Sequence, residues 1–294
     1  LIVDFNKDAN GKVISFGLTS PSGRPHAEVN ALKKISKKID RRKLTAYISL
    51  EPCFKNKSNS CSALLYKAGI RRIVIDSLDP NPEIHNQGNL FLKKKKIQIL
   101  ISNSVSRFKD LNKYFYKYNT SSQAFITLKL AISQNGYVKD FNSPDITSKK
   151  TQQYLHYLRL RHDAIGVGYN TLIDDQPQLT CRLNGINKHL KKIIFIKKNT
   201  NSSIQNNNFQ FIDYDKNSLK QSLYDKLLKS NVRSLLVEGG LSTFMNFFKT
   251  GCYDEIVLTK SKNNVVSSSA RYKIKKNLFD GLLEHSNNNY GNDQ

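Results

Sequence analysis

His26, Cys53 and Cys61 are the residues of this sequence whose types and spacing point most directly to chemistry. One histidine nitrogen and two cysteine sulfurs suit a tetrahedral zinc ion whose fourth position is left to water. Glu28 stands two residues after His26, and side chains at positions i and i+2 of a helix do not face the same way. We therefore expect Glu28 to move protons to and from the bound water rather than to bind the metal.

The order of these residues, His-x-Glu followed by Pro-Cys, is the pattern of zinc-dependent nucleobase deaminases. The segment from Phe54 to Ser60 makes the spacing between the two cysteines longer than in that pattern. The alternative interpretation is a structural histidine with two buried thiols, which is the commoner fate of such residues. Because the residue types occur in the required order, each next to a turn or strand pattern, we predict a zinc site.

Length and composition predict a globular protein. The chain has 294 residues, enough for about two domains, and 38% of its residues are hydrophobic. It has no apolar run of membrane-spanning length and no signal-peptide pattern, so we expect a soluble cytoplasmic protein. With four cysteines in all, two of them assigned to metal, a disulfide framework is not expected.

The formal charge of +24 is the unusual feature of the composition. Taken alone, it indicates a nucleic acid or a phosphorylated ligand. The lysines are spread along the whole chain beside asparagine runs such as Asn206 to Asn208, and a proteome-wide bias toward these two residues gives the same picture. We favour the bias over a nucleic-acid surface.

The first half of the chain alternates strand and helix patterns. Strands are predicted at 1–3, 13–18, 44–50, 72–76 and 97–101, and helices at 26–38, 61–68, between 82 and 97, and near 105–116. A hairpin turn is expected at 7–11, and Pro80 and Pro82 predict a loop at 79–82. The pattern predicts a helix-sheet-helix domain over 1–117, with the metal at the sheet edge where two helices begin.

The polar segment from Tyr118 to Gln123 is the predicted linker, and an α/β pattern restarts after it over 123–294. Strands are predicted at 124–132, 164–167, 193–196, 233–237 and 255–259, and helices at 147–161, 218–230 and 242–249. The turn from Val237 to Thr243 runs from a strand through two glycines into a helix, so its backbone N–H groups suit a phosphate.

Several longer motifs fit one family. The first half contains P-H-A-E-V-N-A-L at 25–32, L-E-P-C at 50–53 and D-P-N-P at 79–82. The second half contains L-K-L-A-I-S-Q-N-G at 128–136, I-T-S at 146–148, L-R-L-R-H-D-A-I-G-V-G at 158–168, T-L-I-D-D-Q-P-Q-L-T-C-R at 171–182 and V-E-G-G at 237–240. Together these motifs resemble the bifunctional deaminase-reductase of riboflavin biosynthesis, and the resemblance covers nearly the whole chain.

The resemblance implies an N-terminal cytidine-deaminase-like α/β/α layer domain and a C-terminal dihydrofolate-reductase-like α/β domain. The implied reactions are zinc-dependent deamination of a phosphoribosylated pyrimidine and then reduction of its ribose to a ribityl chain with NADPH. The implied partner is this phosphorylated small molecule, with no membrane and no nucleic acid, and a homo-oligomer is left open.

The resemblance also assigns residues. It implies that His26, Cys53 and Cys61 bind zinc and that Glu28 is catalytic. The positions that would face the substrate are Lys129, Ser143, Arg159, Leu179, Arg182 and Glu238. The positions that would line the dinucleotide are Ala131, Asp145, Thr171, Asp175, Gly240, Leu241, Ser242, Thr243, Phe244, Met245 and Asn246.

The sequence departs from the family pattern in the loop from Phe54 to Ser60, and family segments are missing upstream of Leu1 and after Gln294. We therefore expect a fragment of a longer chain. Two alternatives stay open. The altered loop would also fit a reductase with a decayed deaminase domain, and the +24 charge would also fit a basic base deaminase that acts on RNA.

Overall fold

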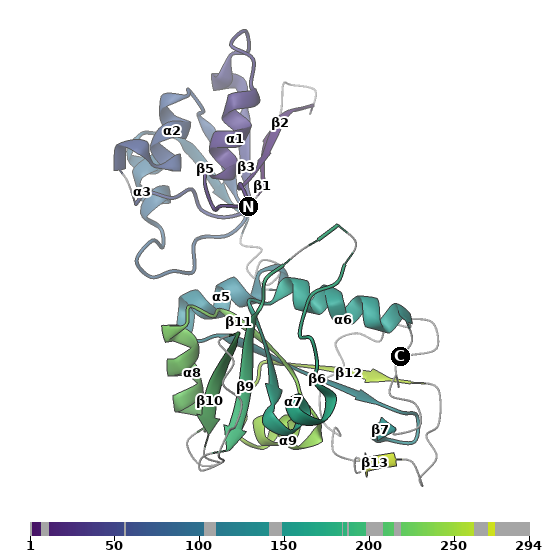
Figure 1. Ribbon diagram of the computed structural model, residues 1–294. Helices are drawn as coiled ribbons and strands as arrows, with labels where there is room; N and C mark the ends of the chain where they lie inside the picture. The colour runs from purple at the N-terminus through teal and green to yellow at the C-terminus, as the bar shows by residue number, and fades with distance from the viewer. Residues whose placement is uncertain are drawn as a thin grey trace. The chain divides into compact units, whose positions relative to one another are not determined.

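The computed structural model describes residues 2–6, 12–55, 57–102, 110–140, 149–183, 185–186, 188–197, 208–214, 219–261 and 270–273. The chain divides into two compact units, Leu1–Ser121 and Ser122–Gln294 (Figure 1). Each unit has its own sheet and its own hydrophobic core. None of the helices within the described ranges has the length and apolar character that crossing a membrane requires.

The N-terminal unit is built on a five-stranded sheet with the order β2-β1-β3-β4-β5. Its strands are β1 (Ile2–Asn6), β2 (Val13–Leu18), β3 (Thr45–Ile48), β4 (Arg72–Ile75) and β5 (Gln98–Ile101). Its helices are α1 (Ala27–Lys34), α2 (Cys61–Lys67), α3 (Gln87–Lys94) and α5 (Lys113–Ser121), with short 3-10 turns η1 (Arg41–Lys43) and η2 (Lys57–Asn59). Strand β1 is antiparallel to β2 and β3, whereas β3, β4 and β5 are parallel.

Helices α1, α2 and α3 bury their apolar sides in one cluster on this sheet. Ala31, Leu65 and Leu92 come from the three helices, and each is 0% exposed beside Ile73 of β4. Small residues let α1 approach β2 closely, because a Cβ added to Gly17 would lie 2.2 Å from the Ala27 carbonyl oxygen. This packing fixes the first turn of α1 against the sheet, and with it the residue that precedes the helix.

The C-terminal unit is built on a six-stranded parallel sheet with the order β10-β9-β8-β11-β6-β12, and a second, antiparallel pair joins β7 and β13. Its strands are β6 (Phe125–Ile132), β7 (Tyr137–Asp140), β8 (Ala164–Gly168), β9 (Lys191–Lys197), β10 (Phe209–Tyr214), β11 (Ser234–Glu238), β12 (Glu255–Lys260) and β13 (Ala270–Lys273). Its helices are α6 (Lys149–Arg161), α7 (Tyr169–Asp175), α8 (Leu219–Lys229) and α9 (Leu241–Lys249).

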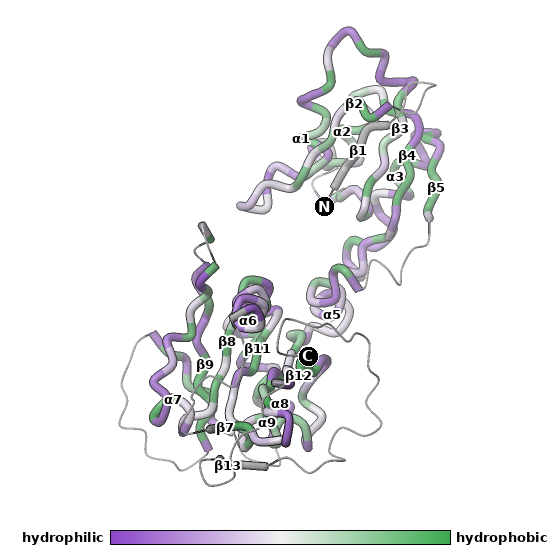
Figure 2. The backbone as a smooth tube through the Cα atoms, turned by 90° about the vertical axis from the view of Figure 1, so that its right-hand side faces the viewer, coloured by the Kyte–Doolittle hydropathy of each residue, from purple (hydrophilic) through white to green (hydrophobic). Residues whose placement is uncertain are grey.

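Helices cover both faces of this parallel sheet, as all-parallel sheets require. Leu155 and Leu158 of α6 pack on Leu236 of β11. The neighbouring residues Leu235 and Val237 point to the opposite face, where they join the cluster that contains α8 and α9. All of β8 is buried, and the central strands are coloured mostly white to green in Figure 2. The alternation along β11 thus puts Glu238 on the α6 face.

Most predicted strands and helices are confirmed, with ends shifted by a few residues. Of the helix predicted near 105–116, residues 105–109 lie outside the described residues, as do 147–148 and 218 at the starts of two other predicted helices. Helix α1 ends at Lys34 rather than at 38, because the chain is already extended at Ile35. The linker prediction is wrong for 118–121, since α5 continues through Ser121. Helix α7 and strands β7, β10 and β13 were not predicted. The hairpin turn predicted at 7–11 lies outside the described residues.

Candidate functional site

Three metal-ligating side chains converge where β3 ends and two helices begin. His26 is the N-cap of α1 and Cys61 is the first residue of α2, while Cys53 follows β3. The Cys53 Sγ lies 3.5 Å and the Cys61 Sγ 3.4 Å from Nδ1 of His26. All three ligand atoms lie within 4.8 Å of one another. One zinc ion bound at about 2.0–2.3 Å from each ligand can span such a set.

Hydrogen bonds around α2 explain why the two cysteines meet despite the long segment between them. Ser60 caps the helix, since its Oγ accepts the N–H of Ala63 at 3.2 Å. Ser62 Oγ donates to the Pro52 carbonyl at 2.8 Å, and the Ser62 N–H donates to the Cys53 carbonyl at 3.2 Å. The backbone at Cys53 is therefore tied to the first turn of α2.

The two thiols have pKa values shifted in opposite directions. A hydrogen bond from Cys61 lowers the pKa of Cys53 to about 5, and the nearby His26 acts in the same direction. The same interaction, together with burial, raises the pKa of Cys61. The lowered pKa of Cys53 favours its thiolate, which is the form of cysteine that binds zinc.

Glu28 lies in the first turn of α1 and is 1% exposed. Its Oε2 has no hydrogen-bond partner among the residues that the structure describes. Burial raises the pKa of Glu28, and the charge of Cys53 adds to this effect. A buried, unpartnered carboxylate oxygen beside a His-Cys-Cys donor set fits a zinc site in which the carboxylate handles protons instead of binding the metal.

Glu51 is a further residue of this region whose role sequence reasoning missed. Its side chain is 3% exposed. Its Oε2 accepts the N–H groups of Asp79 at 3.2 Å and Asn86 at 2.8 Å, and its Oε1 accepts the N–H of Asn89 at 3.1 Å. The carboxylate next to Pro52-Cys53 therefore holds the segment after β4 and the start of α3 in place. Its only signal in the sequence is its position in the L-E-P-C motif.

A second cluster of charged side chains lies on the α6 face of the C-terminal sheet. Glu238 ends β11 and is paired in register with Lys129 of β6. Arg159 of α6 donates to both Glu238 oxygens, from Nε at 2.7 Å and from Nη2 at 2.8 Å. Burial alone would raise the pKa of Glu238, but the hydrogen bonds and charge of Arg159 hold it below its usual value. Burial also lowers the pKa of Lys129.

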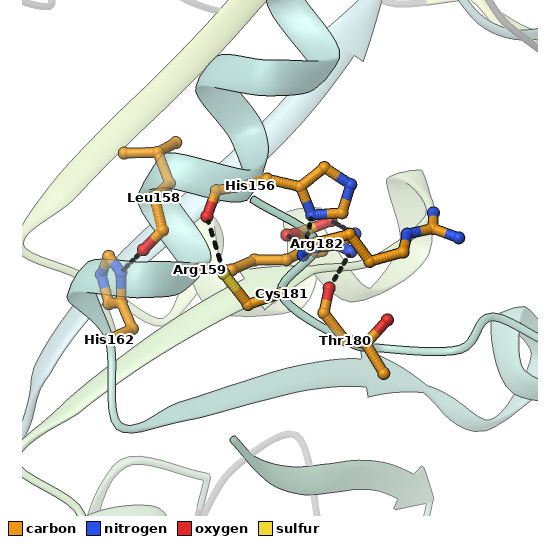
Figure 3. Close-up of polar contacts among 8 residues, drawn as sticks. His156, Leu158, Arg159, His162, Thr180, Cys181 and Arg182 are labelled. Atoms are coloured by element: carbon orange, nitrogen blue, oxygen red, sulfur yellow. Dashed lines mark hydrogen bonds and ion pairs between the residues drawn. The ribbon is translucent and has the colours of Figure 1, made fainter. Parts of the chain in front are cut away.

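The segment after α7 completes this cluster (Figure 3). Nη1 of Arg159 donates to the Thr180 carbonyl at 2.8 Å, which places the neighbouring residues beside α6. Arg182 is exposed, and its Nη1 donates to Gln178 Oε1 at 3.0 Å. Leu179 has a φ of 50°, and its 2% exposed side chain packs in a core cluster. Leu179 can thus reach a ligand only through its backbone.

The glycine turn after β11 meets helix α7. Gly240 is the N-cap of α9, and its N–H donates to Thr171 Oγ1 at 3.2 Å. Its φ of −64° is available to any residue. A Cβ on Gly239 would lie 2.6 Å from the Cβ of Thr243, so this glycine is required by close packing. The turn brings Gly240, Thr171 and Thr243 together at a helix N-terminus, which favours an anionic group.

The remaining residues predicted to line the cofactor differ in how exposed their side chains are. Leu241 and Met245 pack against the core, Phe244 is 1% exposed within it, and Asn246 is half-buried. Ser242 and Asp175 are exposed, and Ala131 is half-buried in β6. Ser143 and Asp145 lie outside the described residues.

Comparison with known proteins places both units. Residues 5–77 match the cytidine and deoxycytidylate deaminase zinc-binding region, and residues 124–261 match the RibD C-terminal domain. The chain is 31% identical over 276 residues to the riboflavin biosynthesis protein RibD of Aquifex aeolicus, covering 84% of this chain and 77% of the relative. It is 30% identical over 290 residues to RibD of Buchnera aphidicola, covering 85% and 77%.

Solved structures agree. A diaminohydroxyphosphoribosylaminopyrimidine deaminase/5-amino-6-(5-phosphoribosylamino)uracil reductase from Thermotoga maritima has a TM-score of 0.78 and 26% identity, covering 90% of this chain and 80% of the other. Acinetobacter baumannii RibD, at 24% identity and a TM-score of 0.82 over 99% and 89% of the two chains, shows the same fold.

Fold and sites together define a bifunctional enzyme in which a zinc-dependent deaminase unit precedes an NADPH-dependent reductase unit. The chain belongs to the RibD family, the deaminase-reductases of riboflavin biosynthesis.

Proposed function

We propose that residues 1–117 remove an exocyclic amine from a phosphoribosylaminopyrimidine and that residues 123–294 then reduce its ribose to a ribityl chain. Both reactions are named for the Thermotoga maritima relative. The observation that carries the first assignment is the convergence of His26, Cys53 and Cys61 within 4.8 Å, with the unpartnered Oε2 of Glu28 buried beside them.

In the deaminase unit, His26, Cys53 and Cys61 would hold the zinc. When bound, the metal lowers the pKa of a water molecule enough for it to attack the ring carbon that carries the amine. Glu28 would take a proton from that water and pass it to the departing amine, which would leave as ammonia. The raised pKa of Glu28 suits this transfer because the carboxyl can hold the proton between the two steps.

In the reductase unit, bound NADPH supplies the hydride that reduces C1 of the ribose. The N–H groups after Gly240 and the Thr171 hydroxyl would hold the cofactor phosphates. Glu238, oriented by Arg159, accepts hydrogen bonds from ribose hydroxyls. Reduction at C1 requires the C1–O bond of the ring to open, and the Lys129 ammonium, whose pKa is lowered by burial, would give the ring oxygen its proton.

The test is an assay of the purified protein with the diamino pyrimidine phosphate, with and without NADPH, following both ammonia and NADPH. We expect ammonia release without NADPH, and NADPH loss that depends on prior deamination. If the protein releases no ammonia from the diamino pyrimidine phosphate but still reduces the same compound supplied already deaminated, the result would favour a reductase with a decayed deaminase domain. Neither reaction in zinc-replete protein would refute the proposal.

We propose a small-molecule substrate rather than RNA, although the net charge is +24. The lysines are spread along the chain, and an RNA-acting deaminase leaves the Arg159–Glu238 cluster of the second unit without a role. Deamination of the pyrimidine phosphate but not of single-stranded RNA is the expected result.

A further inference from the structure

His156 is fastened to the segment that carries Arg182. It lies on α6, one turn before Arg159. Its ring Nδ1 accepts the backbone N–H of Arg182 at 3.2 Å, and its carbonyl oxygen accepts the Cys181 thiol at 3.4 Å. With the bond from Arg159 to the Thr180 carbonyl, α6 holds three consecutive residues in place, as Figure 3 shows.

The bond at Nδ1 fixes the protonation state of His156. A backbone N–H always donates, so Nδ1 must be the bare nitrogen and Nε2 must carry the proton. A second proton on Nδ1 would face the N–H of Arg182. Burial, and then the charges of Arg159 and Arg182, lower the pKa of His156 and so act in the same direction, whereas the charge of Glu238 and a hydrogen bond with the Thr180 backbone act against them. The ring is therefore neutral and offers one donor, Nε2–H.

Arg182 is the exposed cation of this cluster. Arg159 already donates from all three of its nitrogens, from Nε and Nη2 to Glu238 and from Nη1 to the Thr180 carbonyl. Arg182 is exposed, and within the described residues its guanidinium donates only to the neutral Gln178. In Figure 3 the second ring nitrogen of His156 and the Arg182 guanidinium lie on the same side of the segment. Together they present a cation and a neutral N–H donor.

We propose that His156 is a binding and positioning residue for the phosphate of the reductase substrate. Its Nδ1 holds the Arg182 backbone so that the guanidinium faces the phosphate, and its Nε2–H donates to a phosphate oxygen. This inference rests on the proposed reductase function. A neutral imidazole suits the position because it gives a hydrogen bond to the anion while its other nitrogen keeps the Arg182 N–H satisfied.

Two substitutions separate the two halves of this role. His156→Asn can keep an acceptor near the Nδ1 position but loses the distal donor, whereas His156→Gln can keep a distal donor but loses the acceptor. We expect His156→Asn to raise the KM for the phosphorylated substrate about tenfold, which is the effect of one hydrogen bond to a charged group. Its kcat should stay unchanged, and so should the KM for the same substrate without its phosphate group. His156→Gln should weaken binding through Arg182, so its KM should also rise. The control is His189→Asn, an exposed histidine of the same unit.

The result that overturns the inference is a His156→Asn protein with the parent KM, or one whose KM rises equally for both substrates. A parent protein that reduces neither substrate would instead refute the proposed function. In that case the ¹⁵N NMR spectrum of the histidines tests the role of His156 independently of activity. His156 should show a bare Nδ1 and a protonated Nε2 whose resonance shifts when ribose 5-phosphate is added, and an Nδ1-protonated ring or an unmoved Nε2 contradicts the role assigned here.

Discussion

Replacing Glu51 should destabilise the segment from Asp79 to Asn89 in the deaminase unit. Its buried carboxylate accepts three backbone N–H groups, from Asp79, Asn86 and Asn89. Burial and the charge of Glu51 raise the pKa of Asp79, and Cys53 also acts on it. Loosening Glu51 would thus free the segment that lies beside the metal ligands.

The structure gives the magnitude. A buried N–H left without an acceptor costs about 1–3 kcal/mol. Glu51→Ala orphans all three groups, and because water can enter the space left behind we expect about 3–5 kcal/mol of local destabilisation. Glu51→Gln keeps one carbonyl oxygen. If that oxygen takes the place of Oε2 it still serves Asp79 and Asn86, so only the bond to Asn89 is lost, at about 1–3 kcal/mol.

Hydrogen exchange followed by mass spectrometry on peptides covering 79–89 measures this opening directly. Exchange should accelerate about tenfold to a hundredfold in Glu51→Gln and further in Glu51→Ala. Glu83→Gln is the matched control, since Glu83 is exposed in the same segment. Equal exchange rates in Glu51→Gln and Glu83→Gln would refute the reasoning.

Three further outcomes follow from single groups. Glu28→Gln should keep zinc but lower deamination by about a hundredfold or more, since the amide keeps the shape and loses the base; ammonia release at the parent rate would show that another group transfers the proton. Gly240→Val adds a side chain whose Cβ lies 3.4 Å from Thr171 Oγ1, so NADPH affinity measured by fluorescence should fall about tenfold with deamination unchanged, and parent-like affinity would mean the phosphates bind elsewhere. Arg159 holds the pKa of Glu238 below 4.5, so the ion pair stabilises the fold above that pH, and this stability should be lost as acid protonates the carboxylate in the folded protein. A Glu238→Gln protein whose urea midpoint falls as steeply with acid as the parent's would contradict this.

The grouping of His26, Cys53 and Cys61 could be predicted because short motifs encode it. His26 and Cys61 each stand directly before or at a helix start that the sequence also indicates, and neighbouring parallel strands bring such starts to one sheet edge. Most strands of the two large sheets could also be predicted, because each is a local run of apolar residues in the sequence. β10 was missed although Phe209 and Phe211 show the period-two pattern of a strand.

Other features depend on contacts between residues distant in the chain. The polar residues after Tyr118 read as a linker, yet Thr120 and Ser121 hydroxyls bond back to carbonyls one turn earlier within α5. Neither the clamp at Glu51 nor the bond between His156 and Arg182 can be read from spacing, since each joins residues at least 26 positions apart.

Elemental analysis of the zinc-replete protein tests the central claim most directly. We expect about one zinc per chain, lost in Cys53→Ala because two remaining ligands rarely hold the ion against buffer. Cys252→Ala is the control, as Cys252 is a buried thiol in the core of the other unit and should leave zinc unchanged. Zinc near one per chain in the parent and in Cys252→Ala, with little in Cys53→Ala, is the result this account predicts. An intact protein without zinc, or a Cys53→Ala protein that keeps it, would contradict the account.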